Sequence, residues 1–561
     1  MLKSNLNRIE KGASGDALFR IFGNAADKLI IAVLLGSICL FVLYPIICIF
    51  WQSFVGETGL TLGAYTDVLK GYRTSLWNSL FTGVLTAFFC TVLSVAAALV
   101  ISSSRGWVKL LLMGVILITM VSPPFVSSLA YIQLYGRRGW ITYRLLNISW
   151  DPYNCWGVIW MQSISFVPLN ALFLSGILTK IDAASIQAAR DLGAGPKHIL
   201  LDVVLPLMRP GILVTLLLTF VRSIADFGTP TIIGGRFNTL ASDIYMQLVG
   251  YSNPAKAAAM NVILLVPTLL AFWAYRVMLQ KSDKLTSGKG KQDTVNLKLL
   301  RCGIVGWIAL ILSMLFFVMM VLQYVCIFSL GFMKVTKGSY SFSLQYLQQL
   351  LKYDTATIWR SVIYALIVSF VGTFFSMLFA YYTERRNVPG RRFFDFLVMM
   401  PYMIPGTCFG IGYILAFNKE PMKLTGTALI VMACMLFKQL PTTTKLCSAA
   451  LTQVPRTLEW SARDLGGGRM AVLRDVILPS MRPAFLSCFA HNFSSSMTTA
   501  GAIIFLINPG KKLLVFQLFD KVYLGEYPMA SLLATLIIVI VLAVEGLVWL
   551  ISWKEGKRRV S

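Results

Sequence analysis

Long apolar segments recur along the whole chain, and they constrain its fold more than any other feature of the sequence. A helix that crosses a bilayer core about 30 Å thick needs roughly 20 apolar residues. Only 13% of the 561 residues are charged, whereas soluble domains carry about 25%. We therefore predict an all-α polytopic membrane protein with about twelve transmembrane helices, and exclude a soluble enzyme and a disordered chain. The predicted spans lie near residues 28–52, 77–103, 108–134, 154–179, 210–234, 257–279, 302–328, 359–383, 393–417, 425–450, 483–507 and 529–553.

Basic residues gather in four segments that flank the apolar ones. The segment before residue 28, the stretch 281–301, the turn 384–392 and the tail 554–559 all carry an excess of Lys and Arg. Cytosolic loops of membrane proteins collect these residues, and an even number of spans puts all four segments on one side. We therefore expect both termini in the cytosol, which leaves the basic residues near 137–144 outside. The formal net charge of +26 is interpreted as membrane topology, and nucleic-acid binding is excluded.

The sequence offers no pattern typical of a metal, redox or nucleotide site. Most of the ten cysteines fall inside apolar segments, none forms a C-x-x-C pair, and only His198 and His491 could supply imidazole ligands. No Gly-x-x-x-x-Gly-Lys-Ser/Thr loop occurs, so we expect the chain itself neither to bind nor to hydrolyse ATP. The prediction is a chain without catalytic residues, metal ligands or a cofactor of its own.

An internal repeat divides the chain into two halves. Shifted by 273 positions, residues 187–210 align with residues 460–483 without a gap, and fourteen of these 24 positions are identical. The polar stretch 281–300 is predicted to be a cytosolic linker between a first repeat, 1–280, and a second repeat, 301–561. Each half holds about six predicted spans, and an even number per half makes the two repeats parallel.

The repeated segments are too polar to span a membrane and are predicted to form cytosolic loops near 181–210 and 454–483. In the first loop Asp182 can cap a short helix, and Gly193 can end that helix in a left-handed turn. In the second loop Pro455 suits the first helical position. A second helical stretch follows in each loop, and we expect it to stop at its proline, namely at Leu205-Pro206 and at Leu478-Pro479.

This doubled pattern resembles the loop motif of binding-protein-dependent ABC importer permeases of the MetI-like type, which reads E-A-A, three residues, Gly, nine residues, I-x-L-P. Both copies keep the spacing, but the leading acid is replaced by Gln187 and by Trp460. In that family the loop forms a coupling helix that docks on the ATPase. The resemblance therefore implies a coupling role for Gln187, Ala188, Ala189, Arg190, Asp191, Gly193, Pro206, Trp460, Ser461, Ala462, Arg463, Asp464, Gly466 and Pro479.

Two copies in one chain are similar to the fused permeases of the ferric-iron importer group. The resemblance implies a transport subunit, not an enzyme, in the inner membrane of a bacterium. It also implies a homodimeric cytosolic ATPase, which would bind ATP and Mg²⁺, and an extracytoplasmic solute-binding protein. Closure of the ATPase would rock the two halves and give alternating access. The implied cargo is ferric iron, with phosphonate, thiamine and polyamines as open alternatives.

Charged residues inside the fifth predicted span are candidates for the translocation pathway. Arg222 and Asp226 stand one helical turn apart, where they can neutralise each other. They either face the pathway or form a structural pair between helices. The run that continues into Phe227 and Gly228 resembles the Asp/Glu-Phe-Gly run of iron-type permeases, which adds these two residues to the candidates.

The second half contributes different candidates to the same pathway. Ser495 and Thr499 are the repeat mates of the charged pair, so the pathway is expected to be asymmetric. Pro124 and Pro405 are placed to break the third span of each half, as gate elements or as simple kinks. Lys438, in the middle of a span, has no partner that the sequence identifies.

An ion- or proton-coupled secondary transporter is the alternative function, because such transporters also contain parallel repeats. It would need a coupling carboxylate deep in the membrane, for which Asp226 or Glu545 qualifies. This alternative gives no reason for the doubled cytosolic motif. A membrane-embedded enzyme would need a nucleophile, a metal site or an acid–base pair, and the sequence presents none of these patterns.

Overall fold

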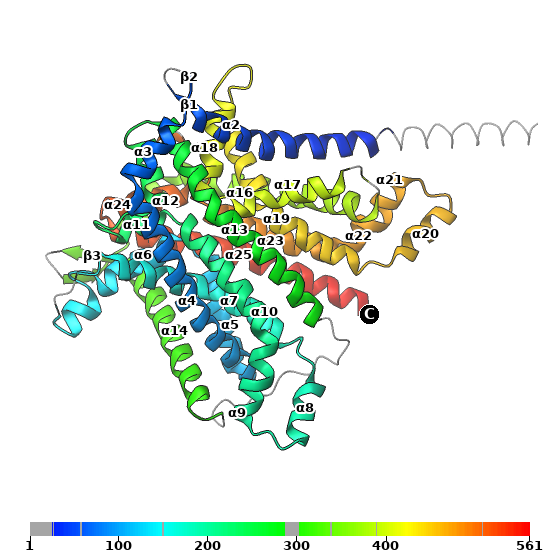
Figure 1. Cartoon of the computed structure of the whole chain (residues 1–561), viewed down its shortest axis with the longest axis horizontal. Coiled ribbons are helices and arrows are strands. Elements are labelled where there is room, and N and C mark those ends of the chain that lie inside the picture. The colour runs from blue at the N-terminus through cyan, green and yellow to red at the C-terminus, as the bar shows by residue number, and fades with distance from the viewer. Residues whose placement is uncertain are drawn as a thin grey trace, which may run out of the picture.

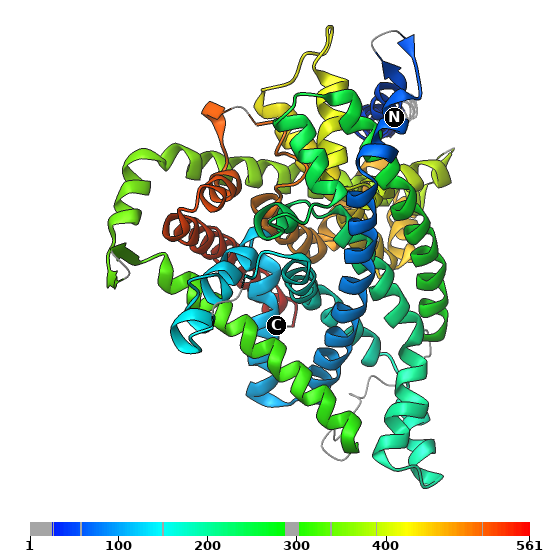
Figure 2. The ribbon, with the colours of Figure 1, turned by 60° about the vertical axis from the view of Figure 1, so that its left-hand side comes forward.

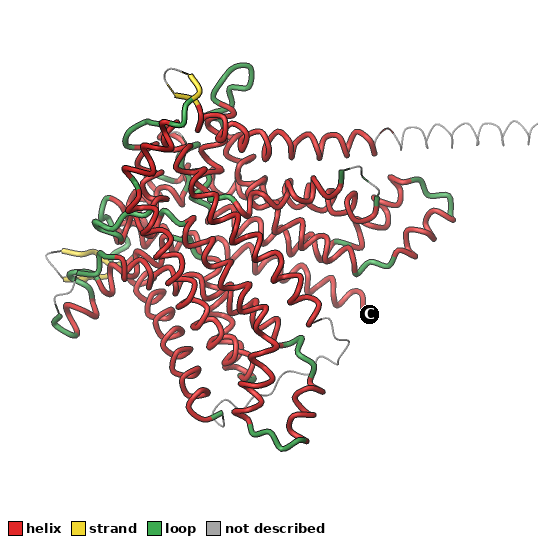
Figure 3. Tube along the Cα trace, in the orientation of Figure 1, coloured by secondary structure: helices red, strands yellow, loops and turns green. Residues whose placement is uncertain are grey.

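The computed structural model describes residues 25, 27–56, 59–148, 151–286, 302–336, 339–386, 388, 390–507 and 509–560. Residues 1–24 of the basic N-terminal segment, residues 287–300 of the predicted linker and residue 301 lie outside this set. Figure 3 shows helices throughout the body of the molecule, with two short antiparallel hairpins at its periphery. They pair β1 (Val55–Gly56) with β2 (Gly59–Leu60), and β3 (Met333–Thr336) with β4 (Ser339–Phe342).

Eight helices among the described residues are long and apolar enough to cross a bilayer. A helix satisfies its own backbone hydrogen bonds, which is why such segments are helical in lipid. The first half supplies Asp27–Phe54, which ends in α2 (Tyr44–Phe54), α4 (Arg73–Ser103), α7 (Cys155–Leu178), Pro196–Ala225, which ends in α10 (Leu205–Ala225), and α13 (Pro254–Thr286). The second half supplies α14 (Gly303–Leu330), α16 (Thr355–Arg385) and α25 (Tyr527–Val560).

The third predicted span of each half is a sharply bent pair of helices. In the first half α5 (Gly106–Val121) meets the segment that begins with α6 (Phe125–Tyr135) at 109°. In the second half α17 (Arg391–Met403) meets α18 (Gly406–Phe417) at 113°. Pro124 and Pro405 are the N-cap residues of α6 and α18, so the predicted positions of both breaks are confirmed.

The fourth and fifth predicted spans of the second half are helical but less apolar. They form α19 (Ala428–Thr452), which contains Lys438, and α23 (Arg482–Thr498), which has 17 residues. Neither is among the eight helices that meet the length and hydropathy requirements. The number of membrane crossings, about twelve, therefore stays a prediction.

Shorter elements connect the long helices. The helices are α3 (Gly63–Gly71), α8 (Ala183–Asp191), α9 (Pro196–His198), α11 (Gly228–Ile233), α12 (Leu240–Val249), α15 (Gln345–Tyr353), α20 (Arg456–Asp464), α21 (Arg469–Ala471), α22 (Leu478–Ser480) and α24 (Leu514–Tyr523). Wider π-helical turns occur at η1 (Cys39–Leu43), η2 (Trp140–Leu145), η3 (Ile199–Val204) and η5 (Val472–Ile477), and a 3₁₀ turn at η6 (Pro509–Lys511).

The long helices form two arms that diverge from a common end (Figure 1). One arm contains α4, α7 and α10 and ends at α8 and α9, the first repeated loop. The other contains α16, α19 and α23 and ends at α20 and α21, the second repeated loop. The hairpins and the short helices α3, α11, α12 and α24 gather at the common end, so the two loops lie far from these elements.

The two halves exchange their first helices. Helix α2 belongs to the first half but packs against α18 of the second, and η1 in the same span packs against α17 and α19. Helix α14 belongs to the second half but packs against α4, α5 and α6 of the first, and its course along them is visible in Figures 1 and 2. Each arm is therefore completed by a helix from the opposite half.

Candidate coupling loops and translocation junction

The short helix predicted in the first loop is present with its predicted ends. The Asp182 carboxylate accepts a hydrogen bond from the Ala184 backbone N–H at 2.9 Å, and α8 begins at the next residue. Gly193 follows the helix with φ of +84°, a left-handed conformation that favours glycine. Both predictions are confirmed because capping and termination depend on neighbouring residues alone.

The second loop repeats this geometry with one difference. Gly466 has φ of +85° and donates its N–H to the Arg463 carbonyl at 2.9 Å, as Gly193 does to Arg190. Pro455 was predicted at the first helical position, but it is the N-cap residue, with an extended ψ of 137°. The proline therefore ends the preceding turn, and the helix begins one residue later.

Both helices bury a single, equivalent position, and most of their other residues are exposed. Ile186 is the buried residue of α8, and its repeat mate Glu459 is the buried residue of α20. The leucines that precede the two glycines, Leu192 and Leu465, are 88% and 89% exposed, and Trp460 is 57% exposed. Exposed apolar side chains therefore stand at equivalent places on the two separate loops.

The second helical stretch does not stop at its proline, contrary to our prediction. The first stretch runs unbroken from Pro196 through η3 into α10, so Pro206 lies inside a helix of 30 residues. In η3 the hydrogen bonds widen, and the Leu205 N–H bonds to the Leu200 carbonyl. We attribute the continuity to this wider turn, which accommodates a residue without an N–H. The second copy also passes Pro479 and loosens only at Met481.

Matched acids on these stretches carry a basic partner in each copy. The Asp202 carboxylate accepts a hydrogen bond from Nδ1 of His198 at 3.1 Å, and its repeat mate Asp475 pairs with Arg474 at 2.7 Å. The Arg474 guanidinium lowers the pKa of the Asp475 carboxyl through its hydrogen bonds and its charge. Both pairs are exposed, so we expect them to contribute little to stability.

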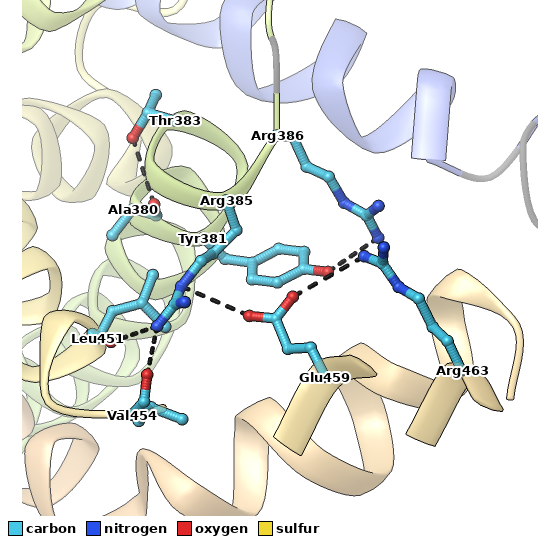
Figure 4. Close-up of polar contacts among 9 residues, drawn as sticks. All are labelled: Ala380, Tyr381, Thr383, Arg385, Arg386, Leu451, Val454, Glu459 and Arg463. Carbon is cyan, nitrogen blue, oxygen red and sulfur yellow. Dashed lines mark hydrogen bonds and ion pairs between the residues drawn. The ribbon is translucent and has the colours of Figure 1, made fainter. Parts of the chain in front are cut away.

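A buried ion pair that the sequence did not reveal holds the second loop (Figure 4). The Arg385 guanidinium lies 3.4 Å from the Glu459 carboxylate, and each side chain is only 6% exposed. Arg385 also donates to the carbonyls of Leu451 at 2.7 Å and Val454 at 2.5 Å. The exposed guanidinium of Arg463 lies 3.8 Å from the other carboxylate oxygen. The one indication in the sequence was that Glu459 aligns with Ile186 in the repeat, and Ile186 is the residue that faces inward in the first loop.

Each first helix also contacts the loop of the opposite half. Asp27, at the start of the first span, accepts a hydrogen bond from the Tyr382 hydroxyl at 2.9 Å and lies 3.7 Å from Arg469 of α21. Cys302, directly before α14, donates its thiol to the Pro196 carbonyl at 3.5 Å. The helix exchange therefore continues to the repeated loops.

Arg222 and Asp226 do not form the predicted pair; no ion pair joins them in the described part of the chain. Helix α10 ends at Ala225, and the Asp226 carboxylate accepts from the N–H groups of Gly228 at 3.0 Å and Thr229 at 3.3 Å. The side-chain amide of Gln162 donates to it at 3.0 Å. Asp226 therefore accepts from the first two N–H groups of α11, whose N-cap residue is Phe227, and its carboxylate is satisfied without Arg222.

Arg222 has a different environment. Its guanidinium carbon lies 4.6 Å from the centroid of the Phe166 ring, a cation–π geometry. Its buried Nη1 atom has no hydrogen-bond partner among the described residues. The side chains of Ser495 and Thr499, the repeat mates, carry no charge, and the Thr499 hydroxyl donates to the Ser495 carbonyl at 2.6 Å. Whether these residues line an asymmetric pathway stays a prediction.

Five aromatic side chains from both halves meet at the common end of the arms. Phe227 contacts Tyr245, Phe519 and Phe125, with ring centroids 5.4, 6.2 and 6.4 Å apart. Tyr245 also contacts Phe505 at 6.1 Å. We call this group the aromatic junction. It lies among α6, α11, α12 and α24, at the end of the molecule opposite the repeated loops (Figure 1).

Two glycines allow the close approach of backbones and rings at this junction. A Cβ atom on Gly228 would lie 2.4 Å from the Phe125 ring, the residue that follows Pro124. Its repeat mate Gly501 packs between Phe227 and the backbone of Gly406, the residue that follows Pro405. The structure therefore brings both broken spans against the ends of both fifth-span helices.

Lys438 has partners that the sequence did not identify. Its ammonium group donates to the carbonyls of Pro401 at 2.6 Å and Ile404 at 2.7 Å, where α17 ends at the bend. These carbonyls lose their helical partners at the break, and a cation is favourable at a helix C-terminus. At the corresponding break in the first half, the Ser122 hydroxyl donates to the Thr119 carbonyl and also forms a hydrogen bond with the Tyr324 hydroxyl.

We expect Lys438→Met to destabilise the chain, because two buried carbonyls would lose their donor at a cost of about 1–3 kcal/mol each. The measurement is the apparent Tm of the purified chain in detergent. Lys423→Met, at an exposed position between α18 and α19, is the control and should leave the Tm unchanged. An unchanged Tm for Lys438→Met would contradict the assigned role.

No group of three or more His, Cys, Asp and Glu side chains in the described ranges is arranged to hold a metal ion. All ten cysteines are free thiols.

Comparison with known proteins places these features in a family. The model of the binding-protein-dependent transport system inner membrane component matches residues 90–284 and again residues 372–552, one match in each repeat. The ferric transport system permease protein FbpB of Actinobacillus pleuropneumoniae is 28% identical over 554 residues, covering 95% of this chain and 79% of that protein. A putative ferric transport system permease protein, FbpB 1 of Haemophilus influenzae, is 29% identical over 521 residues, covering 88% and 80%.

A shorter relative matches a smaller part of this chain. The molybdenum transport system permease protein ModB of Mycobacterium tuberculosis is 33% identical over 204 residues, which cover 35% of this chain but 76% of that protein. The two family matches, together with the repeated loops and the apolar helices, identify a multi-pass inner-membrane transport subunit. The chain belongs to the family of binding-protein-dependent transport system inner membrane components, and it contains the family's domain twice.

Proposed function

We propose that the chain is the permease subunit of an ATP-driven importer and that its cargo is ferric iron. The observation that carries the proposal is the pair of matched loops at the ends of the two arms, each with an exposed leucine after a short helix. The cargo rests on the two relatives named as ferric transport permeases, which align with most of the chain. Phosphonate, thiamine and polyamines are the alternative cargoes to be tested.

The two loops call for a partner with two equivalent docking sites. A homodimeric cytosolic ATPase meets this requirement, and it would bind the ATP and Mg²⁺ that the chain has no loop to bind. An extracytoplasmic binding protein would deliver the cargo at the aromatic junction, opposite the loops. With the loops in the cytosol, about twelve crossings place both termini there as well. The repeats 1–280 and 301–561 and the linker 281–300 stay proposals, and the first six residues of that linker continue helix α13 to Thr286.

The proposed mechanism is alternating access. In the conformation described here the arms lie apart at the loops, while the aromatic junction packs at the opposite end. ATP-driven closure of the partner would draw α8 and α20 together. Because the first loop continues without a break into α10, which ends at Ala225, that movement would reach Phe227 and Gly228 through one continuous helix. Separation of the aromatic rings would then open the pathway to the outside.

The test begins with purification of the tagged chain from its native membrane and identification of the proteins that accompany it. We expect an ATPase at two copies per chain, and its loss in a Leu192→Asp/Leu465→Asp variant that still inserts into the membrane. Uptake of radioactive ferric iron by the complete system then tests the cargo. Absence of any ATPase overturns the importer proposal, whereas uptake of another solute in place of iron overturns only the cargo.

A further inference from the structure

The inward-facing position of each coupling helix is occupied by a different kind of residue. In the first loop this residue is Ile186, which belongs to an apolar cluster with Ile199 and Leu200. In the second loop the repeat mate is Glu459, whose side chain is as deeply buried. A buried carboxylate is unfavourable unless it is paired, so its presence at this position requires a specific partner.

Arg385 is that partner, and it joins three helices at one point (Figure 4). It is the last residue of α16, its Nη2 atom donates to two carbonyls at the end of α19, and its Nε atom faces Glu459 of α20. The guanidinium has several donors in a rigid plane, which suits it to such simultaneous contacts. Two hydrogen bonds at the end of α19 and a close charge contact with α20 therefore connect the three helices through Arg385.

We propose that Glu459 and Arg385 are positioning residues that make α20 move as one body with α16 and α19. The family motif has its acid one residue later, at the position of the exposed Trp460. Neighbouring helical residues point about 100° apart, so this shift turns the acid from the outer face to the inside. The acid of the second copy thus acts within the permease and not on the partner.

The inference rests on the proposed coupling function. A displacement of α20 relative to α16 would separate two desolvated charges, which is costly. A movement that the partner imposes on α20 is therefore passed directly to α16 and α19.

Hydrogen exchange of the purified full-length chain tests the positioning role. In Glu459→Gln we expect amide exchange in 456–464 to accelerate about tenfold or more, because a buried guanidinium loses its counter-charge. Exchange in 183–191 serves as an internal control and should not change. Arg463→Gln is the matched control variant, since it removes only the exposed partner of Glu459 and should leave exchange as in the wild type. Unchanged exchange in Glu459→Gln overturns the proposal.

A second variant and a second readout separate positioning from general damage. Arg385→Met/Glu459→Met removes both charges, and we expect this double variant to insert into the membrane at least as well as either single variant, because an apolar pair is tolerated in place of a buried ion pair.

The second readout is the number of ATP molecules hydrolysed per solute imported, measured with the partner ATPase bound. Glu459→Gln should raise this ratio, and Glu459→Asp should restore it. Faster exchange with an unaltered ratio would retain the positioning role and reject the coupling function, whereas poorer insertion of the double variant would reject the ion-pair argument.

Discussion

Replacing Gly466 with valine is expected to abolish uptake while the chain still inserts into the membrane. The glycine ends α20 at φ of +85°, and a branched side chain there costs roughly 1–2 kcal/mol or more. The helix would relieve the strain by changing its exit angle, so that α20 no longer presents Leu465 and Trp460 in the same orientation. Uptake by the assembled system and membrane content of the chain are the two measurements.

The loop supplies its own control. Gly468 lies two residues further on with φ of −67°, and a Cβ atom there would meet nothing within 4 Å. Gly468→Val should therefore transport normally. The same contrast is available in the first copy, where Gly193 has φ of +84° and Gly195 has φ of −70°. Normal uptake in both Gly193→Val and Gly466→Val would refute the coupling role of the loops.

Gly228→Ala is expected to have the second large effect. Its new methyl group would lie 2.4 Å from the Phe125 ring, a distance at which the ring or α11 must move. Overpacking of this kind typically costs about 1–3 kcal/mol. Because the displaced ring belongs to the aromatic junction, we expect both a lower Tm and a leak of small solutes through the chain in proteoliposomes. The leak, measured without ATP, distinguishes an opened junction from simple destabilisation.

The repeat mate of Gly228 is the natural comparison. A methyl group on Gly501 would lie 3.4 Å from Phe227, which is ordinary contact, although the backbone of Gly406 lies at 4.0 Å on the other side. We therefore expect Gly501→Ala to show no leak of small solutes and to keep most of its uptake. If the two alanine variants behave alike, the closure of the junction does not depend on the Phe125–Gly228 contact.

Features that depend on neighbouring residues followed from the sequence. Asp182, Gly193 and Gly466 act within a single turn, and the breaks at Pro124 and Pro405 result from the geometry of proline itself. The helical class and the two repeats followed from apolar length and from identity between the halves. The same local logic misplaced Pro455 by one residue, since an N-cap and a first helical position differ only in ψ.

Features that depend on partners distant in the chain did not follow. The four-residue spacing predicts a pair between Asp226 and Arg222. In the structure the Asp226 carboxylate instead accepts hydrogen bonds from Gln162 and from the backbone N–H groups of α11. Arg385 and Glu459 are 74 positions apart and come together only through the packing of α16 against α19. Lys438 likewise found its acceptors at a helix end that the bend creates. Only the three-dimensional arrangement supplies such donors and acceptors.

The exchanged first helices have a consequence for synthesis. When α2 leaves the ribosome, α18, against which it finally packs, has not yet been made, and most of the chain must follow before the two can meet. During that interval α2 can pack against α13 of its own half, but the surface that finally meets α18 must rest in lipid or against a temporary neighbour. A first half released alone would lack α18 and also α14, the covering of its own arm. We therefore expect the two halves to mature together, late in translation, and a truncated half to be recognised as unfinished and degraded.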